Sequence, residues 1–96
     1  MTQWLLTHEA ADDLERLTDF LQKTAPETAV ATLDLVLDAL EILARHPRIG
    51  RSFQQGLREL VISRGQSGYL ALYSYDERAD VALVLAIRHQ REQDYH

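Results

Sequence analysis

The 96-residue sequence contains no cysteine and only one lysine, Lys23. The absence of cysteine excludes a disulfide scaffold, a thiolate metal site and a cysteine nucleophile. The N-terminal residues also lack a basic segment, and the apolar run that includes Trp4 stops at Thr7. Because a signal peptide or a membrane span needs a longer apolar run, neither is expected, and we expect a cytoplasmic protein.

Metal and phosphate motifs are missing as well. The four glycines do not form a Walker loop or a dinucleotide-binding loop, and the surroundings of Gly65 and Gly68 do not form a nucleophile elbow. The histidines lack metal-ligand spacing; they are His8, His46, His89 and His96. We therefore expect no cofactor and no metal.

The composition is that of a globular chain, with 46% apolar and 26% charged residues. At this length we expect a single domain covering residues 1–96, with about two thirds of its surface buried on folding. The net charge is −5, which disfavours a protein that coats nucleic acid with its whole surface.

The charge is unevenly distributed along the chain. Residues 1–44 hold nine acids against Arg16 and Lys23, whereas residues 45–96 hold eight arginines against six acids. Five of these arginines lie within residues 45–75, where Glu59 is the single acid. They predict either a local arginine-rich face for a polyanion or acidic partner, or a solvated rim without a partner.

Two periodicities divide the chain. Apolar residues at spacings of three and four predict helices over 8–23 and 26–44, the first capped by Thr7. Asp12 and Asp13 are attributed to the favourable dipole at that helix start. A brief first strand is predicted at 3–6, and an exposed connection at 48–56. After this connection, runs rich in valine, isoleucine, leucine and tyrosine predict three strands over 57–63, 69–75 and 81–89.

The element order is therefore β-α-α-β-β-β. Only Thr24 and Ala25 separate the helices, which demands an antiparallel helical hairpin. Alternation of direction along the chain then places the first strand antiparallel to the second. We expect an α+β domain in which the hairpin packs on one face of one twisted antiparallel sheet.

Polar side chains are concentrated after the last apolar strand, at Arg88, His89 and Arg91, with Tyr95 four residues further on. Arginine binds phosphate or carboxylate, histidine transfers protons near neutral pH, and tyrosine stacks on bases, so the set would suit RNA cleavage. The alternative is structural: Arg88 and His89 would end the sheet by pairing with helix acids such as Asp34 or Asp38, and Tyr95 would cover the edge of the core.

The chain resembles the RelE/ParE superfamily of type II toxin-antitoxin toxins over essentially its whole length, and is most similar to the ParE branch. The most specific motifs are HPRIGR at 46–51, Leu57-Arg58-Glu59-Leu60, Ser67-Gly68-Tyr69 and Ile87-Arg88-His89-Gln90-Arg91. The resemblance implies a small bacterial toxin that is neutralised by a cognate antitoxin, within a toxin-antitoxin hetero-oligomer.

Two activities occur in this superfamily. RelE-like members cleave mRNA on the ribosome with lysines, arginines and a terminal tyrosine or histidine, whereas ParE-like members act on DNA gyrase and lack that full set. The single lysine of this chain lies on the first helix, so the resemblance favours gyrase inhibition. The residues expected to bind the target are then Arg58, Arg64, Arg88 and Arg91. If the chain is instead a ribonuclease, the catalytic candidates are Arg64, Arg88, His89 and Tyr95.

A third hypothesis is a non-toxic module that retains only antitoxin binding. Growth arrest on expression distinguishes it from both toxins, because this hypothesis predicts none.

Overall fold

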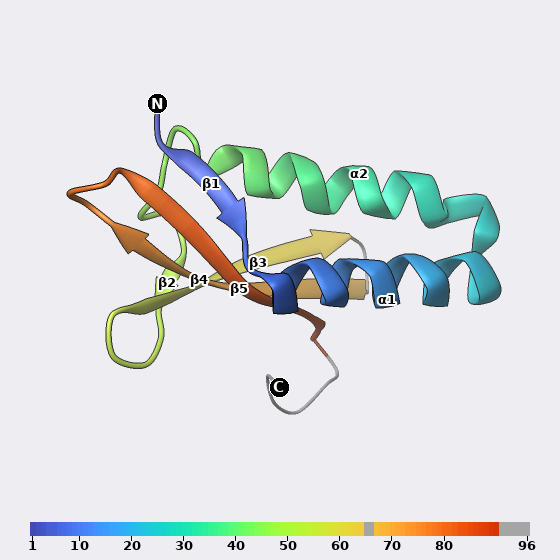
Figure 1. Ribbon diagram of the computed structural model, residues 1–96. Helices are drawn as coiled ribbons and strands as arrows, with labels where there is room; N and C mark the ends of the chain where they lie inside the picture. The colour runs from blue at the N-terminus through green and yellow to red at the C-terminus, as the bar shows by residue number, and fades with distance from the viewer. Residues whose placement is uncertain (65–66, 91–96) are drawn as a thin grey trace.

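The computed structural model describes residues 1–64 and 67–90 (Figure 1). Its elements are β1 (Gln3–Leu6), α1 (His8–Thr24), α2 (Pro26–Ile42), β2 (Arg51–Ser52), β3 (Leu57–Arg64), β4 (Ser67–Asp76) and β5 (Val81–His89). The two predicted helices and four predicted strands are confirmed, with α2 ending two residues before the expected boundary. The prediction missed β2, which lies in the segment expected to be an exposed connection.

Local chemistry sets the helix boundaries. The Thr7 hydroxyl accepts a hydrogen bond from the Ala10 amide at 3.1 Å, and Lys23 lies in the last turn of α1, where a positive charge is favourable. Pro26 occupies the first turn of α2, where its missing amide proton is not needed. Because only Ala25 separates the helices, α1 and α2 form an antiparallel hairpin.

The sheet is mixed, with strand order β1-β5-β4-β3-β2. β1 pairs in parallel with β5, whereas the other neighbouring strands are antiparallel. The expectation of a fully antiparallel sheet is therefore wrong. The physical reason is β2, which pairs antiparallel with β3 through Arg51 and Glu59. This pair adds one chain reversal that the prediction did not include. Every later strand therefore runs in the direction opposite to the expected one, relative to β1.

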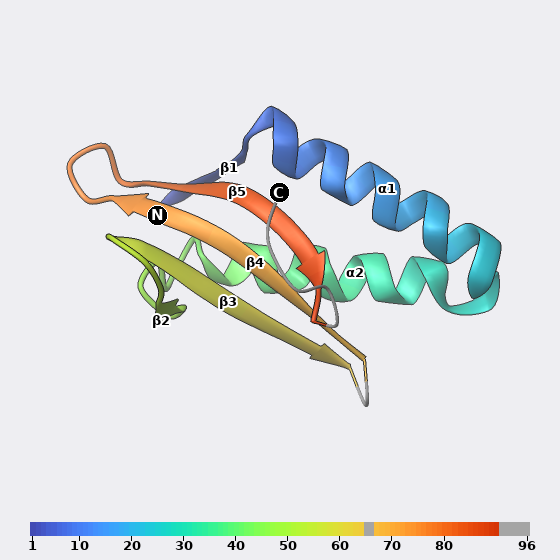
Figure 2. The ribbon, with the colours of Figure 1, turned by 90° about the horizontal axis from the view of Figure 1, so that it is seen from below.

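The α+β architecture is confirmed, since the helical hairpin covers one face of the sheet (Figures 1 and 2). The core lies between these layers and includes Val36, Leu40, Leu60, Tyr73 and Val84. Neither helix in the described part of the chain is long and apolar enough to cross a membrane.

A polar cluster joins the N-terminus to the β4–β5 turn. The Thr2 and Tyr75 hydroxyls both donate to Asp80 Oδ1, at 2.5 and 2.7 Å. Both hydrogen bonds lower the pKa of the Asp80 carboxyl, and the bond from Thr2 has the larger effect. The bond between Tyr75 and Asp80 also raises the pKa of the Tyr75 hydroxyl. The backbone of Asp80 has a φ of 54°, a left-handed conformation that asparagine also tolerates.

Acid should weaken this cluster. A lowered carboxyl pKa in the folded state contributes stability above the ordinary value of 3.8, and that contribution is lost as the pH falls through the folded pKa. We expect Asp80→Asn to remove part of the acid sensitivity of the wild type, measured as urea unfolding from about pH 5 to about pH 2. Identical pH profiles for both proteins would contradict this assignment.

Candidate functional site

The end of β5 extends past its neighbour at the edge of the sheet. β1 stops where Leu6 pairs with Val84, and β5 continues to His89. The pairings of Leu72 with Ala86 and of Tyr73 with Val84 leave Leu85 as an extra residue, so β5 has a β-bulge where β1 ends. β4 still pairs with this last part of β5 on one side, and helix α1 lies on the other side, where β1 has ended (Figure 2).

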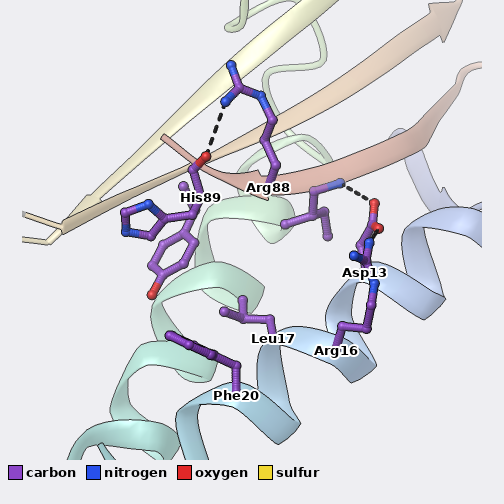
Figure 3. Close-up of a pocket in the computed structure, with 8 residues that line it drawn as sticks. Asp13, Arg16, Leu17, Phe20, Arg88 and His89 are labelled. Atoms are coloured by element: carbon purple, nitrogen blue, oxygen red, sulfur yellow. Dashed lines mark hydrogen bonds and ion pairs between the residues drawn. The ribbon is translucent and has the colours of Figure 1, made fainter. Parts of the chain in front are cut away.

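A cavity of about 470 Å³ opens between α1 and the end of β5 (Figure 3). Arg16 and Phe20 come from α1, and His89 comes from β5. The remaining lining residues are Asp13, Leu17, Tyr69, Ile87 and Arg88. The cavity thus combines an apolar lining with cationic and ionisable groups, which suits a peptide segment that carries both apolar and acidic side chains.

Asp13 connects the helix to this strand. It is only 4% exposed, and its Oδ2 accepts a hydrogen bond from the Ile87 amide at 2.9 Å, while its Oδ1 forms an ion pair with Arg16. Asp12, by contrast, is exposed and lies 3.6 Å from the His8 imidazole. The attribution of Asp13 to the helix dipole therefore missed its main role. The Asp13 carboxylate accepts the hydrogen bond of the Ile87 amide, at the edge of β5 that β1 no longer covers.

Arg88 and His89 leave β5 in opposite directions (Figure 3). The His89 ring packs edge-on against Tyr69, with centroids 5.3 Å apart, on the side of the sheet that the helices cover. Arg88 lies in a row with Val61 and Leu70 on the other face, and its Nη1 donates to the His89 carbonyl at 3.1 Å.

Asp34 and Asp38 are not the helix acids that the structural alternative requires for these two residues. No ion pair links Arg88 or His89 to Asp34 or Asp38 among residues 1–64 and 67–90.

Two arginines stabilise the segment that precedes β3: Arg58, near the start of β3, and Arg51, on β2. Arg58 Nη1 donates to the carbonyl oxygens of Gly50 and Arg48, at 2.8 and 3.1 Å. Arg51 pairs with the buried Glu59, whose Oε1 lies 2.8 Å from the Arg51 Nε. Because Arg58 and Arg64 lie at opposite ends of β3, the structure does not bring these two predicted target-binding arginines together.

Three of the predicted site residues are described incompletely or not at all. Arg64 ends β3, where it pairs with Ser67, and only its backbone is described. Arg91 and Tyr95 lie outside the described residues. Within the described part of the chain, no group of three histidine or acidic residues could hold a metal ion.

Comparison with known proteins identifies the family. The family described as the ParE toxin of type II toxin-antitoxin system, parDE, matches residues 5–94. The chain belongs to this family. The matched residues include both helices and all five strands, apart from the first residues of β1.

The proteins that are similar to this ParE-family chain carry both ParE and RelE names. Toxin RelE3 of Caulobacter vibrioides is 37% identical over 83 residues, which cover 86% of this chain and 88% of that protein. A chain of the chromosomal ParDE system of P. aeruginosa has a TM-score of 0.74 at 22% identity, covering 93% of this chain and 96% of that one. A chain of the E. coli RelBE complex has a TM-score of 0.69 at 14% identity, covering 96% of this chain and 100% of that one. These two structures support the fold.

The motifs behind the resemblance have structural roles in this ParE-family toxin. The HPRIGR motif contains Gly50, whose amide donates to the buried Tyr73 hydroxyl at 2.8 Å. In the motif Leu57-Arg58-Glu59-Leu60, Arg58 donates to the Gly50 carbonyl and Glu59 pairs with Arg51. Burial raises the pKa of Tyr73, and the Gly50 hydrogen bond and the Arg58 charge partly oppose that shift.

Proposed function

We propose that this ParE-family toxin inhibits DNA gyrase in the cytoplasm and that a cognate antitoxin neutralises it. The observation that carries this choice is the arrangement of Arg88 and His89 on opposite faces of β5. A ribonuclease needs a phosphate clamp and a proton donor at one scissile bond. The Arg88 and His89 side chains project from opposite faces of β5 and therefore do not form such a pair with each other.

The single lysine of the chain also favours a target other than ribosomal RNA. Lys23 lies on α1 and cannot supply a cation on the sheet face away from the helices.

The cavity beside α1 supports an antitoxin as partner. Phe20 is 59% exposed at its rim, and Arg16 and His89 supply cationic or ionisable groups there. Such a surface fits a peptide that carries both apolar and acidic side chains. Solved structures with this fold include toxin-antitoxin complexes, among them the E. coli RelBE complex.

Ribosome-dependent mRNA cleavage is the second candidate, because the curated relative at 37% identity is named Toxin RelE3. In that case His89 would transfer a proton, and His89→Ala should lower the cleavage rate by roughly a hundredfold or more.

The two candidates and the non-toxic module are distinguished by one set of assays. We expect the purified toxin to inhibit gyrase supercoiling or to trap cleaved DNA, to leave mRNA intact in reconstituted translation, and to lose its toxicity when the antitoxin is co-expressed. His89→Ala should retain gyrase inhibition within about threefold, because the histidine packs on Tyr69 rather than facing a target. Cleaved mRNA that disappears with His89→Ala would establish the ribonuclease, and absence of growth arrest would leave only the binding module.

A further inference from the structure

The turn that follows α2 carries a cationic surface. An open pocket of about 460 Å³ lies at this turn, and its lining residues are Arg45, His46, Pro47, Arg48 and Ile49. We call these five residues the 45–49 surface. All of them except Pro47 are exposed. The turn lies at the end of α2 that is remote from the connection to α1 (Figure 1), and its pocket shares no residue with the cavity between α1 and β5.

The polar side chains of the 45–49 surface are available to a ligand. In the described part of the chain, the side chains of Arg45 and His46 form no hydrogen bond and no ion pair. Arg48 lies 3.1 Å from a carboxylate oxygen of Glu77, but both side chains are more than half exposed, and such a pair contributes little to stability. A phosphate oxygen can therefore replace Glu77 as the partner of Arg48.

The backbone of this turn is fixed, and several of its carbonyl oxygens are already occupied. Arg58 donates to the carbonyl oxygens of Arg48 and Gly50, at 3.1 and 2.8 Å. The Ile49 amide donates to the His46 carbonyl at 3.1 Å. Arginine side chains supply hydrogen-bond donors only. The 45–49 surface therefore presents donors and positive charge on a turn whose shape is set before any ligand binds.

This combination selects a ligand that supplies acceptors and negative charge. Residues 42–58 contain four arginines and no acid, so the local charge is positive although the whole chain has a net charge of −5. Arg51 is the one that is neutralised by a buried partner, Glu59. A phosphodiester backbone carries one negative charge per phosphate and accepts hydrogen bonds, whereas a peptide also brings N–H groups that need acceptors.

We propose that the 45–49 surface binds the phosphate backbone of duplex DNA, with Arg45 and Arg48 donating to phosphate oxygens. The proposal rests on the proposed function for the source of the DNA, because gyrase holds duplex DNA when it acts. The toxin would then contact the DNA as well as the enzyme. Such contacts carry no sequence information, and we expect a Kd of about 1 to 100 μM at physiological salt for the toxin alone.

The test compares two single substitutions that each remove one exposed cation. Arg45→Ala changes the 45–49 surface just after α2, and Lys23→Ala makes a similar change in the last turn of α1. Binding of a labelled duplex of about 20 base pairs is measured by fluorescence anisotropy at several salt concentrations. We expect Arg45→Ala to weaken binding about fivefold and to reduce the slope of log Kd against log salt by about one. Lys23→Ala should change the affinity less than about twofold and leave the slope unchanged.

A variant with the opposite effect excludes a general loss of structure. Glu77→Gln removes the carboxylate that competes for Arg48, so we expect it to tighten DNA binding about threefold. Arg45→Ala/Arg48→Ala should weaken binding about tenfold or more. Because the substituted side chains are exposed, Arg45→Ala, Lys23→Ala and Glu77→Gln should melt within about 4 °C of wild type.

Three results would overturn the proposal. They are wild-type DNA affinity in Arg45→Ala/Arg48→Ala, tighter binding of an RNA duplex than of DNA, and binding of a polyglutamate peptide in place of DNA. A gyrase supercoiling assay with the same proteins separates this proposal from the proposed function. Gyrase inhibition together with DNA binding that does not depend on Arg45 would overturn the DNA contact alone. DNA binding that depends on Arg45, without any gyrase inhibition, would overturn the proposed function alone.

Discussion

Asp13→Ala is expected to lower the free energy of unfolding by about 2 to 3 kcal/mol, because it leaves the buried Ile87 amide without its acceptor. The same change removes the ion pair with Arg16, which adds little because the guanidinium is exposed. In a domain of this size the loss corresponds to a fall in Tm of about 10 to 20 °C. Urea unfolding and hydrogen exchange at the Ile87 amide measure it.

Two matched variants separate the hydrogen bond from the charge. Asp13→Asn keeps a side-chain oxygen that can accept from the Ile87 amide, so we expect it to cost about 1 kcal/mol. Asp12→Ala removes the neighbouring exposed carboxylate and should stay within about 0.5 kcal/mol of wild type. Equal stability of Asp13→Ala and Asp12→Ala would show that the β5 edge does not depend on α1.

Helices and long strands could be predicted from the sequence because each presents a repeating apolar pattern. Val81–His89 is apolar over nearly its whole length, and its boundaries in the structure are those the pattern predicts. β2 could not be predicted, since the polar pair Arg51 and Ser52 is too short for any periodicity. That single omission made the expected direction of β1 wrong, because one missed reversal inverts the relation of β1 to every later strand.

The candidate site was harder to predict because its contacts join distant parts of the chain. Asp13 and Ile87 are 74 residues apart, and the only local signal was the position of Asp13 three residues after Ala10 on the buried side of α1. A charged residue on an apolar helix face predicts a buried partner, although it does not say which one. The sequence shows the charge of Arg58 but not its acceptors, the carbonyl groups of Arg48 and Gly50. Contact of Arg58 with the target stays a prediction.

Gly50→Ala is expected to destabilise the fold by about 3 kcal/mol, through overpacking and a disturbed hydrogen bond. A Cβ at this position would lie 2.6 Å from Tyr73 Cε1 and 2.8 Å from its hydroxyl oxygen. Tyr73 is fully buried in the core, so its ring has no space in which to move away. Glycine is required here by close approach to a ring, and the measurement is thermal and urea unfolding.

Gly56→Ala is the matched control, because a Cβ there meets no atom within 4 Å while the backbone has a φ of 81°. Its cost comes from the left-handed conformation alone and should be about 1 kcal/mol. Gly50→Ala should therefore be the more damaging of two identical substitutions, although Gly56 has the more unusual backbone. If the order were reversed, the Tyr73 ring would have to be free to swing away from residue 50. The segment containing HPRIGR would then not be fixed to the core through this contact.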